Sequence, residues 1–207
     1  MPLTGVVPPH VPAPVGLDLL ARLRAETRVQ HDAIEQVVDL TGAGLTRAGY
    51  RRRIEQFYGF YRPLEDRMLR AGHGIAPWLD FRERLKTPLL EEDLRALGDD
   101  APGLLATCRE LPGLDGPAEL FGCLYVLEGS TMGGQLISRH IRQTLGVTPD
   151  AGGRFFNGYG TGTGPMWQQF RAALTRYSTA TDTQDRVVAA ARGTFDALRV
   201  WCLRGRA

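Results

Sequence analysis

Apolar residues recur every three or four positions along most of this chain, which is the spacing of an amphipathic α-helix. The pattern predicts long helices over residues 17–38, 46–69, 118–145 and 182–203, a further helix that begins at Pro165, and shorter helices over 78–85, 89–97 and 103–110. No segment shows the sustained alternation of apolar and polar residues that a half-buried β-strand requires. The sequence therefore predicts an all-α protein, a bundle of about eight helices.

Proline is concentrated in residues 1–15. Because proline lacks a backbone N–H and restricts the chain, such a segment resists helix formation. We predict that residues 1–15 form a disordered tail and that residues 16–207 form one helical domain. Residues 146–164 are rich in glycine, but they lack the pattern of a phosphate-binding loop and no strand precedes them, so we expect no nucleotide site there.

The helix predicted over 118–145 contains Gly129, Gly133 and Gly134 near its middle. A glycine inside a helix costs about 1 kcal/mol relative to alanine, so an advantage elsewhere is expected. One interpretation is close packing against a neighbouring helix, since small residues let two backbones approach. The other is a flat ligand lying on the helix backbone, with Gly129 and Gly133 on one face and Ser130 beside them. This stretch alone does not distinguish the two.

A histidine lies in the apolar stripe of the first predicted helix, at His31. It is either a buried core residue or a ligand, and a neutral imidazole suits iron or copper. Glu35, one turn onward, can accept the other ring N–H and orient the ring. Arg24 and Arg28 precede it, where they either form a solvated basic face or bind the carboxylates of an anionic ligand. Haem, which is flat, apolar, dianionic and iron-containing, satisfies all these features.

The composition bounds the other possibilities. The chain has 207 residues, 43% of them hydrophobic and 23% charged, and a net charge of +2, which does not favour nucleic acid as a partner. No apolar run is long enough to cross a membrane, and the N-terminus lacks the pattern of a secretory signal. Its three cysteines form no CxxC pair or CxxCH motif, so we expect a cytoplasmic protein without a disulfide framework, zinc site or covalently attached haem.

Two segments resemble parts of haem oxygenases. Residues 23–35, LRAETRVQHDAIE, resemble the proximal helix of that family, and residues 124–135, LYVLEGSTMGGQ, resemble its distal helix. The order and length of the predicted helices match over about residues 17–204. The likeness is greatest to the bacterial, biliverdin-producing enzymes that are associated with phytochromes. It implies a haem-oxygenase-like helical bundle.

The resemblance also implies roles for individual residues. His31 matches the proximal iron ligand, and Glu35 matches its acidic partner. Gly129 and Gly133 match the glycines that let the distal helix bend over the haem, and together with Ser130 they form the expected catalytic surface. The remaining residues expected to bind the haem are Arg24 and Arg28 near the propionates, Gly134, and Phe195 on the final helix.

The chain departs from the family pattern in two places. Ser130 stands where many relatives carry an aspartate that orders the distal water network, and serine is not a carboxylate. The C-terminal basic residues that bind propionates in animal relatives have no clear match. Arg171, Arg176 and Tyr159 are candidates to replace them.

The resemblance implies an enzyme that cleaves haem to biliverdin, carbon monoxide and iron, with oxygen and with electrons from a ferredoxin or a reductase. A bacteriophytochrome is the implied receiver of biliverdin. One alternative is a non-enzymatic haem carrier or sensor on the same fold. Another is the same bundle without haem, as in thiamin-pathway hydrolases, which need a catalytic cysteine; Cys123 is not obviously placed for that role.

Overall fold

The structure, a computed structural model, describes residues 18–71 and 74–204. Within these ranges it is built from α-helices and contains no β-strand, which confirms the all-α prediction. The α-helices are α1 Leu19–Glu26, α2 Arg28–Val38, α3 Arg47–Ala71, α4 Thr87–Ala96, α5 Pro117–Leu145, α6 Arg154–Asn157, α7 Thr163–Tyr177 and α8 Thr181–Arg204, with 3-10 turns η2 Arg82–Arg84, η3 Pro102–Leu104 and η4 Gly160–Gly162 between them. The predicted tail over 1–15 lies outside the described residues.

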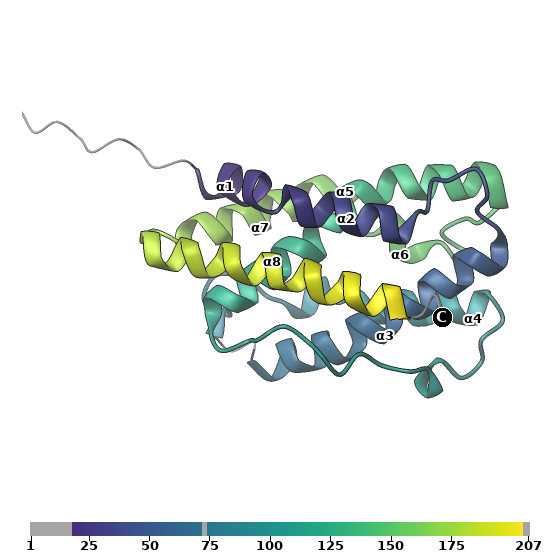
Figure 1. The fold of residues 1–207 in the computed structure, drawn as a ribbon, viewed down its shortest axis with the longest axis horizontal. Coiled ribbons are helices and arrows are strands. Elements are labelled where there is room, and N and C mark those ends of the chain that lie inside the picture. Colours follow the sequence, from purple (N-terminus) through teal and green to yellow (C-terminus); the bar gives the residue numbers. More distant parts are fainter. Residues whose placement is uncertain (1–17, 72–73, 205–207) are drawn as a thin grey trace, which may run out of the picture.

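Helices α5 and α8 form the centre of the bundle and share its most extensive helix–helix contact. In Figure 1, α8 runs between α2 and α3, and it packs against both of them as well as against α1. On the other side of α5 lie α6 and α7. Helices α2 and α5 both pack on α8 but make few contacts with each other, so α8 holds the two helices apart.

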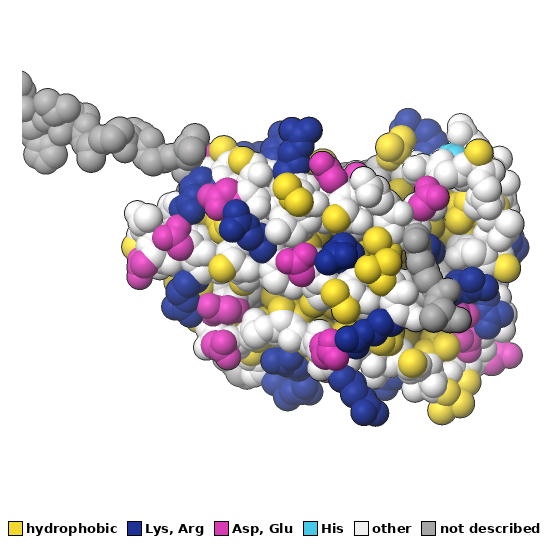
Figure 2. Space-filling view, in the orientation of Figure 1, with side chains coloured by type: hydrophobic (Ala, Val, Ile, Leu, Met, Phe, Trp, Pro, Cys, Tyr) yellow, Lys and Arg dark blue, Asp and Glu magenta, His cyan; other side chains and the backbone are white. Residues whose placement is uncertain are grey.

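The apolar stripe predicted for α3 is confirmed as core. Its members Tyr50, Ile54, Phe57, Tyr61, Leu64 and Met68 are all buried. Fully burying one such side chain contributes about 1.5–3 kcal/mol. The short helix α6 joins this core because the ring of Phe155 lies edge-on to Tyr61, with centroids 5.3 Å apart. Figure 2 shows that basic and acidic side chains alternate over the α2–α8 face, in keeping with the small net charge.

The long predicted helices are found nearly as expected, but two short ones are wrong. Residues 78–85 contain only the turn η2, where the Asp80 carboxylate accepts the N–H of Arg82 and fixes a turn instead of a helix. Residues 103–110 contain only the end of η3. The chain after η3 lies along α3 because Gly59 has no side chain, and the Cys108 N–H donates to the Gly59 carbonyl at 2.7 Å.

The first predicted helix is divided into α1 and α2 at Thr27. The hydroxyl of this buried threonine donates to the Leu23 carbonyl at 2.7 Å, which is the local bonding by which threonine perturbs a helix. Both α1 and α2 pack on α8. No helix in the described part of the chain combines the length and the apolar character needed to span a bilayer.

Asp93 links α4 to the start of α6 and gives the fold a pH dependence that can be tested. Its buried carboxylate accepts the N–H groups of Arg154 at 2.7 Å and Phe155 at 2.8 Å. Burial raises the pKa of Asp93 to about 6 from an ordinary value of 3.8. Between pH 3.8 and about 6, Asp93 binds more protons in the folded protein than in the unfolded chain. Its contribution to the free energy of unfolding therefore falls as the pH rises through this range.

We expect Asp93→Asn to remove that contribution. The melting temperature of wild type should fall relative to the variant as the pH is raised from about 4 to about 7. Thermal melts at several pH values check this, with Asp66→Asn, at an exposed position on α3, as the matched control. If the melting temperatures of wild type and Asp93→Asn change in parallel with pH, the proposed titration of Asp93 is wrong.

Candidate functional site

The glycines of α5 fall into two groups. A Cβ added to Gly122 would lie 2.5 Å from Ala190 Cβ and from the Val187 carbonyl oxygen, so Gly122 lets α5 and α8 approach closely. A Cβ added to Gly129 or Gly133 would meet no other atom within 4 Å. Because these glycines share a helical face with Gly122, that face is closed against α8 at one end and open further along. We call the surface at Gly129 and Gly133 the open glycine face.

Gly134 belongs to the opposite side of the helix. A Cβ at this position would lie 2.8 Å from the carbonyl oxygen of Phe156, so the glycine allows α6 to lie against α5. Gln135 strengthens the same contact, because its side-chain amide donates to the Asn157 carbonyl at 2.8 Å. The structure therefore gives Gly134 a packing role, and Gly129 and Gly133 have none among the described residues.

His31 lies on α2, and its side chain is 52% exposed. The buried side of α2 consists of Ile34, Val37 and Val38, and His31 sits at the edge of that side instead of inside it. Of the two interpretations of His31, a buried core residue or a ligand, the buried core position is not the one observed. The His31 ring meets Phe195 of α8 edge-on, with centroids 5.9 Å apart, and Phe195 itself is buried. A half-exposed imidazole supported on one side by a buried aromatic ring is accessible to a ligand.

Two carboxylates accompany His31 on the same turn. His31 Nδ1 lies 3.7 Å from Glu35 Oε2 and 3.7 Å from Asp32 Oδ1, distances beyond a hydrogen bond in this state. Either carboxylate can accept the Nδ1–H after a small side-chain rotation, which would leave Nε2 as the ligand atom. The predicted proximity of His31 and Glu35 is therefore observed, and Asp32 is an additional neighbour that the sequence analysis did not single out.

Basic and phenolic groups lie at one end of the open glycine face. Arg24 is exposed on α1, and Arg28 is exposed on α2 with its Nε 3.8 Å from Asp32. Tyr125, one turn before Gly129 on the same face, is half-buried and has hydrogen-bond contact with Thr27. Burial raises the pKa of Tyr125, while the Thr27 contact and the charge of Arg24 act against the rise.

Tyr125 was missed by the sequence analysis. Its spacing of four residues from Gly129 was the signal that could have identified it.

Ser130 is exposed beside the open glycine face and has a tyrosine partner. Its hydroxyl donates to the Leu127 carbonyl at 2.7 Å, and the Tyr61 hydroxyl lies 3.3 Å from Ser130 Oγ. Since the serine proton is directed to Leu127, Tyr61 is the donor to Ser130. Burial raises the pKa of Tyr61, so this phenol keeps its proton at neutral pH. The Tyr61–Ser130 pair supplies hydroxyl groups where an aspartate would supply a carboxylate.

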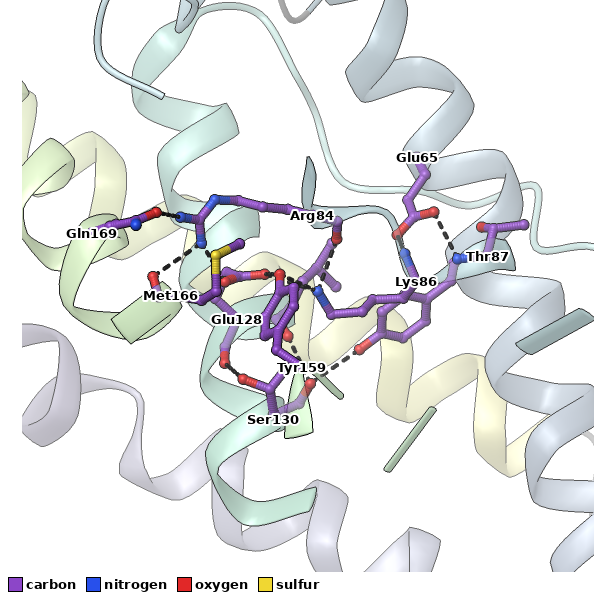
Figure 3. A network of polar contacts seen from close by, with 12 residues as sticks. Glu65, Arg84, Lys86, Thr87, Glu128, Ser130, Tyr159, Met166 and Gln169 are labelled. Atoms are coloured by element: carbon purple, nitrogen blue, oxygen red, sulfur yellow. Dashed lines mark hydrogen bonds and ion pairs between the residues drawn. The ribbon is translucent and has the colours of Figure 1, made fainter. Parts of the chain in front are cut away.

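A buried ionic cluster lies directly behind Gly129, and Figure 3 shows its members. The Glu128 carboxylate pairs with the Arg84 guanidinium, with Lys86 Nζ at 3.0 Å and with the Tyr159 hydroxyl at 2.6 Å. The side chains of Arg84, Lys86 and Glu128 are each only 1% exposed. We call these four residues the Glu128 cluster. Tyr159 is therefore engaged here, and Arg176 donates to the Trp78 carbonyl, so neither is arranged as an additional propionate contact.

The cysteine chemistry that a thiamin-pathway hydrolase would need is not favoured. Cys123 is fully buried, and its sulfur lies 3.1 Å from the Thr194 hydroxyl. Burial raises the pKa of the Cys123 thiol to about 12, so almost none of it is thiolate at neutral pH. A nucleophilic role for Cys123 is therefore disfavoured.

Comparison with known proteins identifies the family to which the chain is similar. Residues 17–204 match the model of the family described as heme oxygenase. A curated heme oxygenase of Xanthomonas campestris pv. campestris (strain 8004) is 33% identical over 94 residues, a match that spans 45% of this chain and only 50% of that relative.

Solved structures share the fold at low sequence identity. The NO- and CO-bound heme oxygenase of Neisseria meningitidis has a TM-score of 0.76 at 19% identity, covering 92% of each chain. Heme oxygenase-1 of Synechocystis sp. PCC6803, solved in complex with heme, has a TM-score of 0.71 at 18% identity, covering 91% of this chain and 92% of that one. Because the family model spans nearly all of the described residues, the chain belongs to the heme oxygenase family.

Proposed function

We propose that this chain binds haem between α2 and α5 and cleaves it to biliverdin, carbon monoxide and iron. The observation that carries the proposal is the open glycine face at Gly129 and Gly133, on a helix that α8 spaces from the accessible imidazole of His31. Side chains at these two positions would occupy the space that a flat ring needs. The imidazole of His31 also suits the iron of haem, since a neutral imidazole is a good ligand for iron.

The surrounding residues would bind the rest of the haem. Arg24 and Tyr125, with Arg28 nearby, supply cations and a hydroxyl donor for the two propionates. Phe195 offers an apolar edge next to His31. When bound, the haem supplies both the iron that activates oxygen and the ring that is oxidised, so it is cofactor and substrate together.

The Tyr61–Ser130 pair would hold and transfer protons on the open side of α5. Tyr61 keeps its proton and donates to Ser130 Oγ. The serine oxygen has a second lone pair, which can accept from a water and orient it on the open side of α5. To pass a proton onward through ordered water, the Ser130 hydroxyl would turn from the Leu127 carbonyl toward that water while Tyr61 donates to Ser130. Electrons would come from an external ferredoxin or reductase, biliverdin would pass to a bacteriophytochrome, and the cytoplasm is the proposed compartment.

A haem titration followed by turnover tests the proposal. The protein is titrated with haem to a stoichiometric end point, ascorbate or a ferredoxin system is added in air, and the products are separated. Formation of biliverdin with release of carbon monoxide supports the proposal. If haem binds and survives reduction unchanged, the protein is a haem carrier or sensor, and if no haem binds, both ideas fail.

We expect Arg24→Glu to weaken haem binding much more than it changes fold stability. A charge-assisted hydrogen bond contributes about 1.5–3 kcal/mol, whereas an exposed charge contributes about 0–1 kcal/mol to folding. The haem dissociation rate should therefore rise roughly tenfold or more. Transfer of haem to excess apo-globin measures this rate, and Arg52→Glu, at an exposed position on α3, is the control. Equal dissociation rates in the two variants would exclude a propionate role for Arg24.

A further inference from the structure

The Glu128 cluster joins three segments of the chain at the residue that immediately precedes Gly129. Arg84 and Lys86 come from the segment around η2 that leads into α4, and Tyr159 comes from the turn between α6 and η4. Lys86 Nζ also lies 2.6 Å from the Tyr159 hydroxyl and 4.2 Å from the centre of its ring. Arg84 reaches further to the Met166 carbonyl on α7 at 3.2 Å. The cluster thus fixes one point of α5 relative to the parts of the bundle on its far side.

Other contacts extend this attachment along the same side of α5. Thr131 is buried next to Gly158, Gly134 lies against Phe156, and Gln135 donates to the Asn157 carbonyl. On a helix, positions 128, 131, 134 and 135 share a side, and Gly129 and Gly133 lie on roughly the opposite side. One side of α5 is therefore firmly attached over the whole length at which the other side is open.

A glycine face has no side chains that can adjust to a ligand. Its distance from a bound ring is therefore set by the backbone position of α5 alone. That distance matters, because a gap of 0.5–1 Å already removes about a quarter to a half of the dispersion attraction between facing atoms. The contacts that fix the α5 backbone at Glu128 therefore control the distance between the next turn of the helix and a flat ligand.

We propose that the Glu128 cluster is a positioning device, with Glu128, Lys86 and Tyr159 as positioning residues that set the height of the open glycine face above the haem. The inference rests on the proposed function in taking haem as the ligand. A buried ion pair often adds little net stability over an apolar pair, because desolvation offsets the attraction. Three buried charged groups and the half-buried Tyr159 phenol converge at this one turn, and they are better explained by the position they impose on α5.

Tyr159→Phe tests the inference with the smallest change, since it removes one hydroxyl between Lys86 and Glu128 and keeps the ring. The probe is carbon monoxide on the reduced haem complex, whose C–O stretching frequency responds to groups on its side of the haem. We expect this band to shift or broaden and the haem dissociation rate to rise roughly fivefold, the equivalent of one hydrogen bond of about 1 kcal/mol. The iron–histidine stretch, which reports on His31, should stay unchanged.

Tyr58→Phe is the matched control. Tyr58 is buried, whereas Tyr159 is half-buried; the Tyr58 hydroxyl lies 3.4 Å from Glu91 on α4, and its ring contacts Arg62, so neither partner lies on α5. It should lower the melting temperature about as much as Tyr159→Phe but leave the C–O band of wild type. A double variant, Lys86→Met with Glu128→Gln, removes one charge of each sign and should shift the band further.

The outcomes distinguish failure of the positioning role from failure of the proposed function. If Tyr159→Phe binds haem, melts like the control and keeps the wild-type C–O band, the cluster only stabilises the fold and the positioning role is overturned. If wild type binds no haem at all, the proposed function fails and the inference fails with it.

Discussion

Replacement of Gly133 by leucine should abolish biliverdin formation while the apo-protein melts at least as high as wild type. Leucine favours a helix over glycine by about 1 kcal/mol, and an added Cβ at this position meets no neighbouring atom within 4 Å. The leucine side chain therefore finds space in the apo-protein. In the haem complex that same space is needed for the ring, so haem binding should fail or the ring should be displaced from the orientation that leads to cleavage.

The other glycines of α5 provide matched controls for this prediction. Gly134→Leu and Gly122→Leu place the same side chain on the same helix, but against the Phe156 backbone and the Val187 backbone respectively. Overpacking of this kind costs typically about 1–3 kcal/mol, so both should melt early without haem. Apo-protein melting and biliverdin yield, measured on all three variants, separate a ligand-contact glycine from a packing glycine. Full biliverdin yield from Gly133→Leu would contradict the haem-contact role.

Replacement of His31 by alanine should remove the axial nitrogen ligand of the haem and reduce turnover to background. The fold should be nearly unaffected, because His31 is 52% exposed and packs only at the edge of Phe195. Exposed substitutions of this kind usually change stability by about 0.5 kcal/mol or less. The ferric absorption and resonance Raman spectra of the haem complex report the loss of the ligand directly.

Added imidazole sharpens the test of His31. If the variant keeps an open space next to Phe195, imidazole in solution should occupy it and restore the nitrogen-ligand spectrum. His140→Ala, near the C-terminal end of α5, serves as the control and should bind haem as wild type does. A His31→Ala variant that shows the wild-type ligand spectrum without imidazole would mean that another residue binds the iron.

The long helices could be predicted because their signals are local. The periodic apolar positions of α3, the Thr46 hydroxyl that accepts the N–H of Gly49, and Gly146 with its positive φ at the end of α5 all lie within or beside the element they define. The helix predicted over 78–85 is wrong because the Asp80 carboxylate forms a local turn that the apolar pattern does not reveal, and the one over 103–110 is wrong because a distant partner decides the conformation. A hydrogen bond to Gly59 of α3, for example, holds the chain at Cys108.

The candidate site also combines features that are local in the sequence with features that depend on distant partners. Gly129, Gly133 and Gly134 look alike in sequence, and only the position of Phe156 on α6 separates the packing glycine from the open ones. Glu128 was visible in the distal motif, but its partners Lys86 and Tyr159 are 42 and 31 residues away in the chain. Periodicity carries no information about such pairs, so the Glu128 cluster could not be derived from the sequence.

The docking of α1 and α2 on α8 has a consequence for synthesis of the protein. These helices lie at opposite ends of the described chain, and they are joined by Arg22 with Asp185 at 2.7 Å and by Arg192 with the Glu26 carbonyl at 2.8 Å. Contacts between such distant segments form late, because a long loop of chain must close first. On the ribosome, the helix that carries His31 lacks its main docking surface until α8 has been translated. The proposed capture of haem by the nascent polypeptide would therefore have to wait until α8 has been translated.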